Sequence, residues 1–278
     1  MGRPNLRRVE GVTAPVPTGR MAIVTGASSG IGRAVALEFA SLGWRVAFGA
    51  RRTDRLEDAA VEARDRGGEV FVHALDVTDP SSVAGFFAAA EAALGPVDVL
   101  VNNAGVAAPG WLDQVPVEAL DREVATNLLG PILMTRLAIG SWKQHGRGGD
   151  VVFVTSDASR HPRPRMAVYT ATKAGLEAFA QALAMELEGS GVRSTAVRVG
   201  PTLTDFGFGW PMDDIEDLLG YWPRFGLQRH NGLLDASAVA HAVVTAVTAP
   251  AGVHFDTIEV QPEAPVDGGP AQAIERPG

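Results

Sequence analysis

Residues 25–32 read TGASSGIG and join two segments with different hydrophobic patterns. The apolar run MAIVTG at 21–26 ends in glycine and predicts a buried strand, whereas the spacing of apolar residues at 33–42 predicts a helix. Gly26 can close the turn, and the later glycines leave room for a pyrophosphate to approach the free N–H groups of the helix. Such turns also occur without a ligand, but the position at the first strand–helix junction favours a dinucleotide site.

The alternation of strand-like and helix-like segments continues along the chain. Further apolar runs predict strands at 45–50, 69–77, 97–105, 150–156, 192–200 and 255–262, and helical spacing predicts helices at 53–66, 81–94, 117–145, 167–188 and 236–248. Near-continuous apolar strands between helices indicate a parallel sheet that is covered on both faces. We therefore predict an α/β, doubly wound Rossmann fold of about seven parallel strands. A single catalytic domain would occupy 21–262, between a flexible extension at 1–20 and a loose tail at 263–278.

Composition narrows the classes of function. The 278-residue chain has a net charge of −8, which argues against a nucleic-acid partner, because nucleic-acid-binding proteins usually present a basic face. It contains no cysteine, so disulfides and thiolate metal sites are excluded, and we expect no metal. The sequence has no run approaching about 18 apolar residues, and its first 20 residues lack the apolar core of a signal peptide. These features predict a cytoplasmic protein that does not span a membrane.

Several short motifs follow the first turn in a fixed order. TGASSGIG has the spacing T-G-x-x-x-G-x-G, and it is followed by LDV at 75–77, NNAG at 102–105, Asn127, Ser156 and YTATK at 169–173. On these motifs the chain resembles the short-chain dehydrogenase/reductase family, of the compact single-domain type, over most of its length. The resemblance implies a nicotinamide cofactor, a small-molecule carbonyl or alcohol substrate, and a homodimer or homotetramer. It also implies cofactor contacts at Gly26, Ser28, Ser29, Gly30, Ile31, Gly32, Asp76, Val77, Asn103, Ala104, Gly105, Tyr169, Lys173, Gly200, Thr202 and Thr204.

One motif departs from the family pattern. After the strand at 192–200 the family usually shows Pro-Gly, whereas this chain has Gly200-Pro201, followed by Thr202 and Thr204. The glycine is retained, but the proline stands on its other side. We expect both threonines still to face the nicotinamide end of the cofactor, although the loop takes a different path.

The end of the second strand indicates which nicotinamide cofactor is preferred. A carboxylate at this position would hold the ribose hydroxyls of NAD, but the strand ends in Gly-Ala and is followed by Arg51 and Arg52. A guanidinium offers a planar fork of donors that suits a phosphate, and Ser28 can add a hydroxyl. We therefore predict NADP(H) in preference to NAD(H). The alternative is that both arginines are solvated, or that one stacks on the adenine.

The YTATK motif holds two scarce residues. The chain has only two tyrosines and two lysines, and Tyr169 and Lys173 stand one helical turn apart. A tyrosine can donate a proton to a developing oxyanion, and a nearby ammonium is expected to lower the pKa of the phenol. The resemblance implies that Lys173 also holds the nicotinamide ribose. A pair of ordinary exposed helix residues is the alternative.

Two further residues complete the catalytic set that the resemblance implies. Ser156 ends the fifth strand, where ligands bind in open α/β sheets, and it would hold the substrate carbonyl oxygen. Asn127 lies within the expected helix at 117–145, where asparagine is unfavourable, and it would hold a water that leads to Lys173. The alternatives are a strand-end cap for the serine and a bond within its own helix for the asparagine.

The segment at 204–230 is dense in aromatic residues and would form a substrate lid. Phe206, Trp210 and Trp222 are its candidate contacts with a bulky, apolar substrate, although they could instead pack the lid on the core or on another subunit. The basic stretch SRHPRPR at 159–165 could meet an anionic substrate group, but a solvated loop or a contact between subunits is favoured.

The motifs together predict an NADP(H)-dependent oxidoreductase that interconverts a ketone and a secondary alcohol. Tyr169 would act as general acid or base, with Ser156, Lys173 and Asn127 in support. Two alternatives remain: reduction of an imine or an activated double bond by the same residues, and a protein that senses NADP(H) without turnover.

Overall fold

The computed structural model describes residues 18–207, 210, 212–227 and 232–263. The expected N-terminal extension, except for its last three residues, and all but the first residue of the expected tail at 263–278 lie outside these residues.

Seven parallel strands form one sheet in the order β3-β2-β1-β4-β5-β6-β7. The strands are β1 (Met21–Thr25), β2 (Arg45–Ala50), β3 (Glu69–Ala74), β4 (Val99–Asn102), β5 (Gly149–Ser156), β6 (Val192–Val199) and β7 (Thr257–Val260). The helices are α1 (Gly30–Ser41), α2 (Thr53–Asp65), α3 (Pro80–Leu94), α4 (Val117–Val124), α5 (Gly130–Gln144), α6 (Ala167–Glu186), α7 (Met212–Arg224) and α8 (Ala236–Val247). The predicted doubly wound fold is confirmed, including the number of strands.

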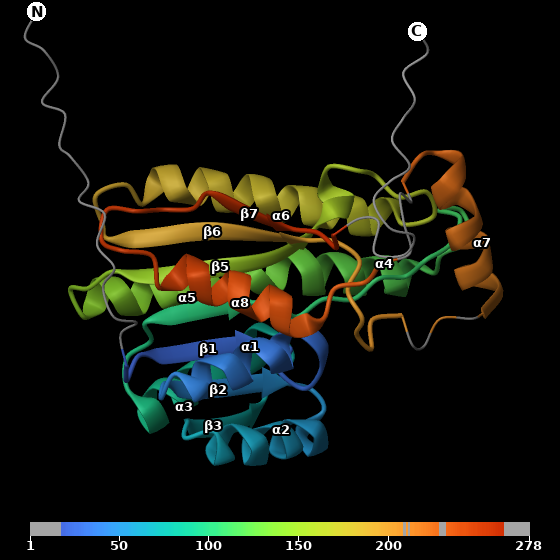
Figure 1. The fold of residues 1–278 in the computed structure, drawn as a ribbon. Coiled ribbons are helices and arrows are strands. Elements are labelled where there is room, and N and C mark those ends of the chain that lie inside the picture. The colour runs from blue at the N-terminus through green and yellow to red at the C-terminus, as the bar shows by residue number, and fades with distance from the viewer. Residues whose placement is uncertain (1–17, 208–209, 211, 228–231, 264–278) are drawn as a thin grey trace, which may run out of the picture.

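Helices cover both faces of the sheet (Figure 1). Along β1, Ala22 and Val24 pack with α1, α2 and α8, whereas Met21 and Ile23 pack with α3, α5 and α6. Successive strand side chains point to opposite faces, so both faces must be apolar. The order reverses at β1, because the chain adds β2 and β3 on one side and β4 to β7 on the other. This switch point is where open α/β sheets bind ligands, beyond the carboxyl ends of the strands.

The expected helix at 117–145 differs from the observed one in its middle. A π-helical turn at Ala125–Leu129 (η1) stands between α4 and α5, and Asn127 lies at its centre. Single π turns inside helices frequently occur at functional sites. The low helix propensity of asparagine was the only local signal of this irregularity.

The lid region contains a helix that the sequence analysis did not identify. α7 runs from Met212 to Arg224 and lies beyond the carboxyl ends of the strands, at the right of Figure 1. It is amphipathic, and Leu218 is its buried residue.

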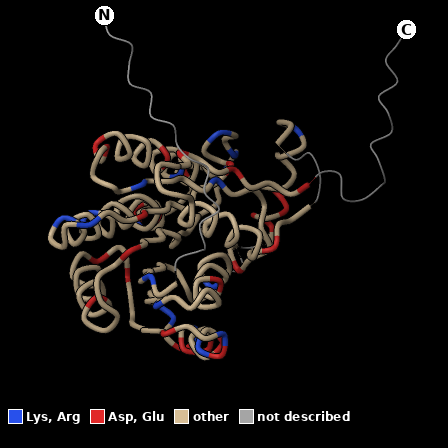
Figure 2. The backbone as a smooth tube through the Cα atoms, turned by 60° about the vertical axis from the view of Figure 1, so that its left-hand side comes forward, with Lys and Arg blue, Asp and Glu red and all other residues tan. Residues whose placement is uncertain are grey.

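Charged residues of both signs are interspersed along the described chain (Figure 2). Within that part of the chain, no helix is long and apolar enough to cross a membrane. It also holds no group of three potential histidine or carboxylate metal ligands.

Candidate active site

A cavity of about 970 Å³ opens at the carboxyl ends of the strands. This volume lies at the upper end of small-molecule sites, which span roughly 300–1,000 Å³. Almost all of the predicted site residues line it: Gly26, Ser28, Ser29, Gly30, Ile31, Arg51, Arg52, Asp76, Val77, Asn103, Ala104, Gly105, Ser156, Tyr169, Lys173, Gly200, Thr202, Thr204, Phe206, Trp210 and Trp222. The two others, Gly32 and Asn127, lie behind this lining.

The turn at 25–32, called the phosphate turn after the ligand that its sequence predicts, is built around close backbone contacts. Gly26 has a φ of +69°, and its N–H donates to the carbonyl of Gly49 at 2.7 Å. At Gly32, a Cβ atom would collide with the Asn103 amide and the Gly26 carbonyl, so only glycine lets α1 pack this closely on the turn. Asn103 supports the turn from behind, since its Nδ2 donates to the carbonyl of Thr25 at 3.0 Å.

Arg52 lies beside this turn and faces its hydroxyl groups. Its guanidinium donates to Ser29 Oγ at 2.7 Å and to Ser28 Oγ at 3.2 Å. The same group is 3.9 Å from the carboxylate of Asp205, which pairs more closely with Arg55 at 2.6 Å. Neither Arg55 nor Asp205 was a predicted site residue. Two arginines and two serine hydroxyls therefore meet at the tip of β2, together with a carboxylate from the loop after β6.

Asp76 lies further along the same wall, beyond the end of β3. Its carboxylate accepts hydrogen bonds from the Thr78 N–H at 3.0 Å and the Thr78 hydroxyl at 2.7 Å. Partial burial raises the pKa of Asp76, but these hydrogen bonds lower it by more. Asp76 is therefore ionised at neutral pH.

The loop after β6 returns to the first turn despite its Gly-Pro order. Thr202 Oγ1 donates to the carbonyl of Gly200 at 2.9 Å, and Thr204 Oγ1 accepts from the N–H of Phe206 at 3.2 Å. Thr204 approaches Gly30 so closely that a Cβ there would lie 3.1 Å from its side chain. Both threonines line the cavity, and this loop lies beside the phosphate turn and leads into the lid.

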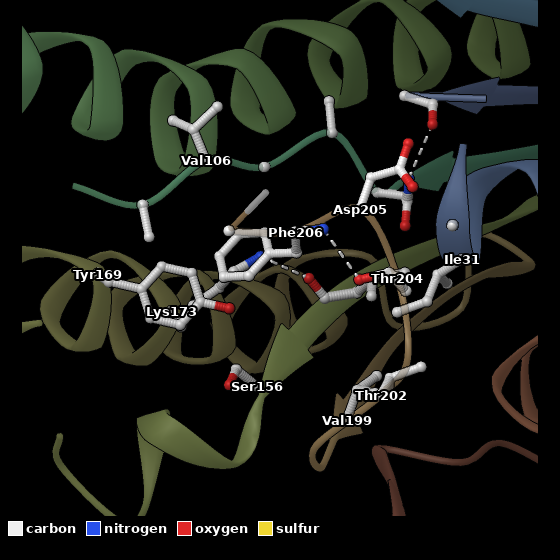
Figure 3. A pocket seen from close by; sticks show the side chains of 18 of the residues that line it. Ile31, Val106, Ser156, Tyr169, Lys173, Val199, Thr202, Thr204, Asp205 and Phe206 are labelled. Carbon is white, nitrogen blue, oxygen red and sulfur yellow. Dashed lines mark hydrogen bonds between the residues drawn. The ribbon is translucent and has the colours of Figure 1, made fainter. Parts of the chain in front are cut away.

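Ser156, Tyr169 and Lys173 lie together at the other end of the cavity (Figure 3). Ser156 ends β5, and its hydroxyl accepts from the N–H of Ala158 at 3.2 Å, so it caps a short 3-10 turn as well as facing the cavity. Its hydroxyl also interacts with Tyr169, which lowers the pKa of the phenol in part. The sheet and α6 thus bring a strand-end serine to the phenol of Tyr169.

The expected lowering of the Tyr169 pKa is wrong in this structure. Burial is the largest effect and raises the pKa of the phenol to about 12. The Lys173 ammonium lies 5.8 Å from the centre of the Tyr169 ring and donates to the carbonyl of Val154 at 2.9 Å, not to the phenol. Burial lowers the pKa of Lys173 to about 8, against the opposing charges of Glu123 and Glu177. Sequence spacing placed the two residues together, but it could not show how strongly both are desolvated.

Asn127 holds the loop that follows β4. Its Oδ1 accepts from the N–H of Val106 at 2.9 Å, and its Nδ2 donates to the carbonyl of Val106 at 2.8 Å. Nδ2 also lies 3.2 Å from the hydroxyl of Thr172, on α6. The side chain therefore bonds to neighbouring segments rather than within its own helix.

Glu123 is a buried residue that the sequence analysis did not single out. It lies on α4 with 1% of its surface exposed, and burial raises the pKa of its carboxyl to about 7. The N–H of Ala108 acts in the opposite direction, as does the charge of Lys173. No local pattern identifies it, because glutamate is common on the exposed face of a helix.

The lid contributes an aromatic wall to the cavity. The ring of Phe206 lies 5.6 Å from that of Tyr169 and 5.5 Å from that of Trp210. The indole N–H of Trp210 donates to the carbonyl of Ala107 at 3.1 Å, which fixes this side chain across the cavity. Trp222, from α7, packs its ring 5.1 Å from the guanidinium of Arg163.

The interpretation of 159–165 as mainly a solvated loop or subunit contact is wrong for two of its arginines. Arg163 is 7% exposed and pairs with Asp157 at 2.6 Å. Arg165 is 8% exposed and pairs with Asp214 and Asp217 on α7, each at 2.7 Å. The basic stretch and the acidic start of α7 therefore neutralise each other and dock the lid.

The chain is similar in sequence and in structure to known proteins. Residues 20–210 match the sequence model of a family described as short chain dehydrogenase. The chain is 37% identical to a glycine betaine reductase of Emericella nidulans over 264 residues, which is 94% of this chain. It spans only 20% of the length of that larger protein.

Two further relatives are similar over more of their length. An NADPH-dependent aldehyde reductase-like chloroplastic protein of Arabidopsis thaliana is 34% identical over 226 residues, which cover 76% of this chain and 83% of that protein. Among solved structures, an alcohol dehydrogenase of the archaeon Thermococcus sibiricus in complex with 5-hydroxy-NADP aligns with a TM-score of 0.74 and 31% identity. That alignment covers 88% of this chain and 99% of the archaeal one.

Proposed function

The chain belongs to the short-chain dehydrogenase family, and within it we propose an NADP(H)-dependent oxidoreductase that interconverts a ketone and a secondary alcohol. One observation carries the proposal: a single cavity has Ser156, Tyr169 and Lys173 at one end and Arg52 beside the phosphate turn at the other. A cofactor that extends from one end of the cavity to the other would present its nicotinamide to the phenol of Tyr169.

The residues at the phosphate turn fit a 2′-phosphorylated cofactor. The N-terminus of α1 would bind the pyrophosphate. Arg52, with Ser28 and Ser29 beside it, would hold the 2′-phosphate. The tip of β2 bears Ala50 and not the carboxylate that favours an unphosphorylated ribose. The printed names of the Arabidopsis and Thermococcus relatives, which mention NADPH and 5-hydroxy-NADP, support this choice.

The residues around Tyr169 fit proton transfer to a carbonyl oxygen. When bound, the cofactor supplies a hydride to the carbonyl carbon or accepts one from the alcohol carbon. The Ser156 hydroxyl would hold the carbonyl oxygen, and the Tyr169 hydroxyl would donate a proton to it. Because its pKa is raised to about 12, Tyr169 is protonated at neutral pH, which is the state needed for carbonyl reduction. Lys173 would hold the nicotinamide ribose and keep a positive charge near the phenol.

A screen of ketones and secondary alcohols with NADPH and NADH, followed by absorbance of the reduced cofactor, tests the function. We expect turnover of bulky apolar ketones with NADPH. Turnover of imines or activated double bonds alone would favour the alternative reductase, and tight NADPH binding without turnover of any compound would favour a sensor. The presence of serine, tyrosine and lysine together disfavours the sensor, because cofactor binding alone does not need all three.

Arg52→Ala is expected to shift cofactor preference. Removal of a charge-assisted hydrogen bond costs roughly 1.5–3 kcal/mol, so the KM for NADPH should rise about 10- to 100-fold. The KM for NADH should change little, because NADH has no 2′-phosphate. Steady-state kinetics with both cofactors measure this, with Arg64→Ala as the control, since Arg64 is exposed on α2, the helix that follows Arg52. Equal losses with both cofactors would contradict the role of Arg52.

Trp210→Ala and Trp222→Ala are each expected to raise the KM for the true substrate. An aromatic contact contributes roughly 0.5–1.5 kcal/mol beyond its burial, so we expect a rise of about 2- to 10-fold. The KM for NADPH should stay within about twofold, because both indoles line the cavity with the lid aromatics. Phe225→Ala is the matched control, since Phe225 is 57% exposed beyond the end of α7. Unchanged substrate KM in both variants would show that these rings only pack the lid.

A further inference from the structure

Glu123 combines deep burial with an oxygen that has no bonding partner. Only 1% of its surface is exposed, and among the described residues no group donates a hydrogen bond to its Oε1. Buried carboxyl oxygens normally accept hydrogen bonds, so an unsatisfied one in a folded interior needs an explanation. Its position on α4 would suit an apolar side chain better, if packing were its only task.

Glu123 reaches the same loop as Asn127. The N–H of Ala108 is a hydrogen-bonding partner of the Glu123 carboxyl, and Asn127 makes two hydrogen bonds with Val106. The two side chains are separated by one helical turn that ends in the π-helical segment. They therefore hold one short segment, at Val106 and at Ala108, and Val106 lines the cavity.

The loop that Glu123 holds also contacts the ammonium of Lys173. Gly105, which precedes the two bonded residues, lies so close that a Cβ there would stand 3.4 Å from Asn127 Oδ1 and 3.6 Å from Lys173 Nζ. The charges of Glu123 and Lys173 act on each other across this region. Glu123 does not line the cavity, so it would act on the reacting groups only through another residue.

Among the described carboxylates that act on the Tyr169–Lys173 pair, Glu123 has no oppositely charged partner in direct contact. Glu177, on α6, accepts from Arg198, Thr155 and Ser159, so its carboxylate is already compensated. Asp157 and Arg163, which face Tyr169 from the loop after β5, pair with each other at 2.6 Å. Within the described part of the chain, Glu123 has no ion-pair partner in direct contact, and Lys173 donates only to the Val154 carbonyl.

We propose that Glu123 is a positioning residue whose carboxylate, held by the loop that contacts Lys173, keeps the Lys173 ammonium charged over a wider pH range. The inference rests on the proposed function, since it assigns a device that tunes the same site. Glu123 would be neutral while Lys173 is securely protonated, and it would ionise when the ammonium begins to lose its proton.

The expected change in the pKa of Lys173 follows from the shifted pKa values of both groups. Burial raises the pKa of Glu123 to about 7 and lowers that of Lys173 to about 8, so the two titrate in overlapping ranges and as a pair. Once ionised, Glu123 adds a negative charge that raises the pKa of Lys173. Without this carboxylate, Lys173 would lose its proton at lower pH.

Glu123→Gln tests the inference through the pH profile of carbonyl reduction. Glutamine has the same shape and stays neutral. We therefore expect the alkaline fall of kcat/KM to occur about one pH unit lower, so that kcat/KM is roughly 10-fold smaller at pH values above this fall. Activity near pH 6 should change less than about twofold, because Glu123 is protonated there in the parent protein. Glu123→Asp should restore the alkaline limb at least in part, since it keeps a carboxyl.

Glu118→Gln is the matched control, because Glu118 is exposed on the same helix and should leave the profile unchanged. The dissociation constant of NADPH, measured by fluorescence over the same pH range, should show the same downward shift in Glu123→Gln. Loss of activity by one factor at every pH, or an unchanged alkaline limb, would overturn the inference.

Thermal unfolding supplies a readout that does not depend on turnover. A carboxyl whose pKa is raised on folding stabilises the fold at low pH and loses that stabilisation as pH rises through its folded value. Relative to the parent protein, the Tm of Glu123→Gln should therefore rise as pH increases from about 4.5 to about 7, whereas that of Glu118→Gln should not. If the parent protein turns over no substrate, the proposed function fails. The pH profiles of NADPH binding and of Tm then still decide the inference, and parallel profiles for the parent protein and Glu123→Gln would overturn it.

Discussion

Tyr169→Phe is expected to lower carbonyl reduction by about 10²- to 10⁴-fold, the range that a positioned proton donor contributes. Only the hydroxyl group is removed, and the ring can keep its contact with the ring of Phe206, whose centre lies 5.6 Å away. NADPH binding should change little, because the phosphate turn and Arg52 lie at the other end of the cavity. Stopped-flow turnover and NADPH titration measure the two effects separately.

Tyr221→Phe is the natural control, because Tyr221 is the only other tyrosine in the chain. Its ring packs edge-on against Trp111 at 5.6 Å and does not line the cavity. We expect activity close to that of the parent protein. Retention of more than about a tenth of the activity by Tyr169→Phe would remove tyrosine from the proposed role of proton donor.

Lys173→Arg is expected to cost on the order of 10²-fold in kcat/KM, although it keeps the positive charge. The side chain is 4% exposed, and its Nζ fits between the Val154 carbonyl at 2.9 Å and the backbone of Gly105. A planar guanidinium is broader than an ammonium and stays protonated at all accessible pH values. It would have to move the loop or tilt away, and a misplacement of about 1 Å in an active site can cost 10²-fold.

The loss should include weaker NADPH binding, because Lys173 is proposed to hold the ribose. Lys143→Arg provides the control, since Lys143 is the only other lysine and is exposed on α5. Full activity in Lys173→Arg would show that charge alone is sufficient. Full NADPH affinity with lost turnover would place Lys173 in proton transfer and not in cofactor binding.

Features that depend on a few neighbouring residues were predictable from the sequence. The turn at 25–32 was identified because strand period, helix period and glycine conformation are local properties, and the structure brings its residues to the cavity. The fold followed in the same way, because alternating apolar strands and helices admit few arrangements other than a doubly wound sheet. The boundaries of the long helix were near the observed ones, but the π turn at Asn127 was not foreseen.

The site also contains pairings that no local pattern could reveal. Arg55 and Asp205 are 150 residues apart in the chain and form an ion pair at the cofactor end of the cavity. Arg165 and Asp214 are 49 residues apart and dock the lid helix. Each of these side chains is typical of a solvated surface, so composition alone favoured exposure. Their pairing depends on where the loops after β5 and β6 lie.

By itself, the sequence determined the order of strands and helices, the phosphate turn, and the spacing that aligns Tyr169 with Lys173. Only the tertiary structure decided the electrostatic state of that pair. It buried Lys173 and half-buried Tyr169, raised the pKa of Tyr169 to about 12, and placed Glu123 where its charge acts on Lys173. The physical reason is that spacing along a helix sets direction, whereas the free energy of a charge depends on the water it loses and the charges it meets. Both are set by segments that are distant in the chain.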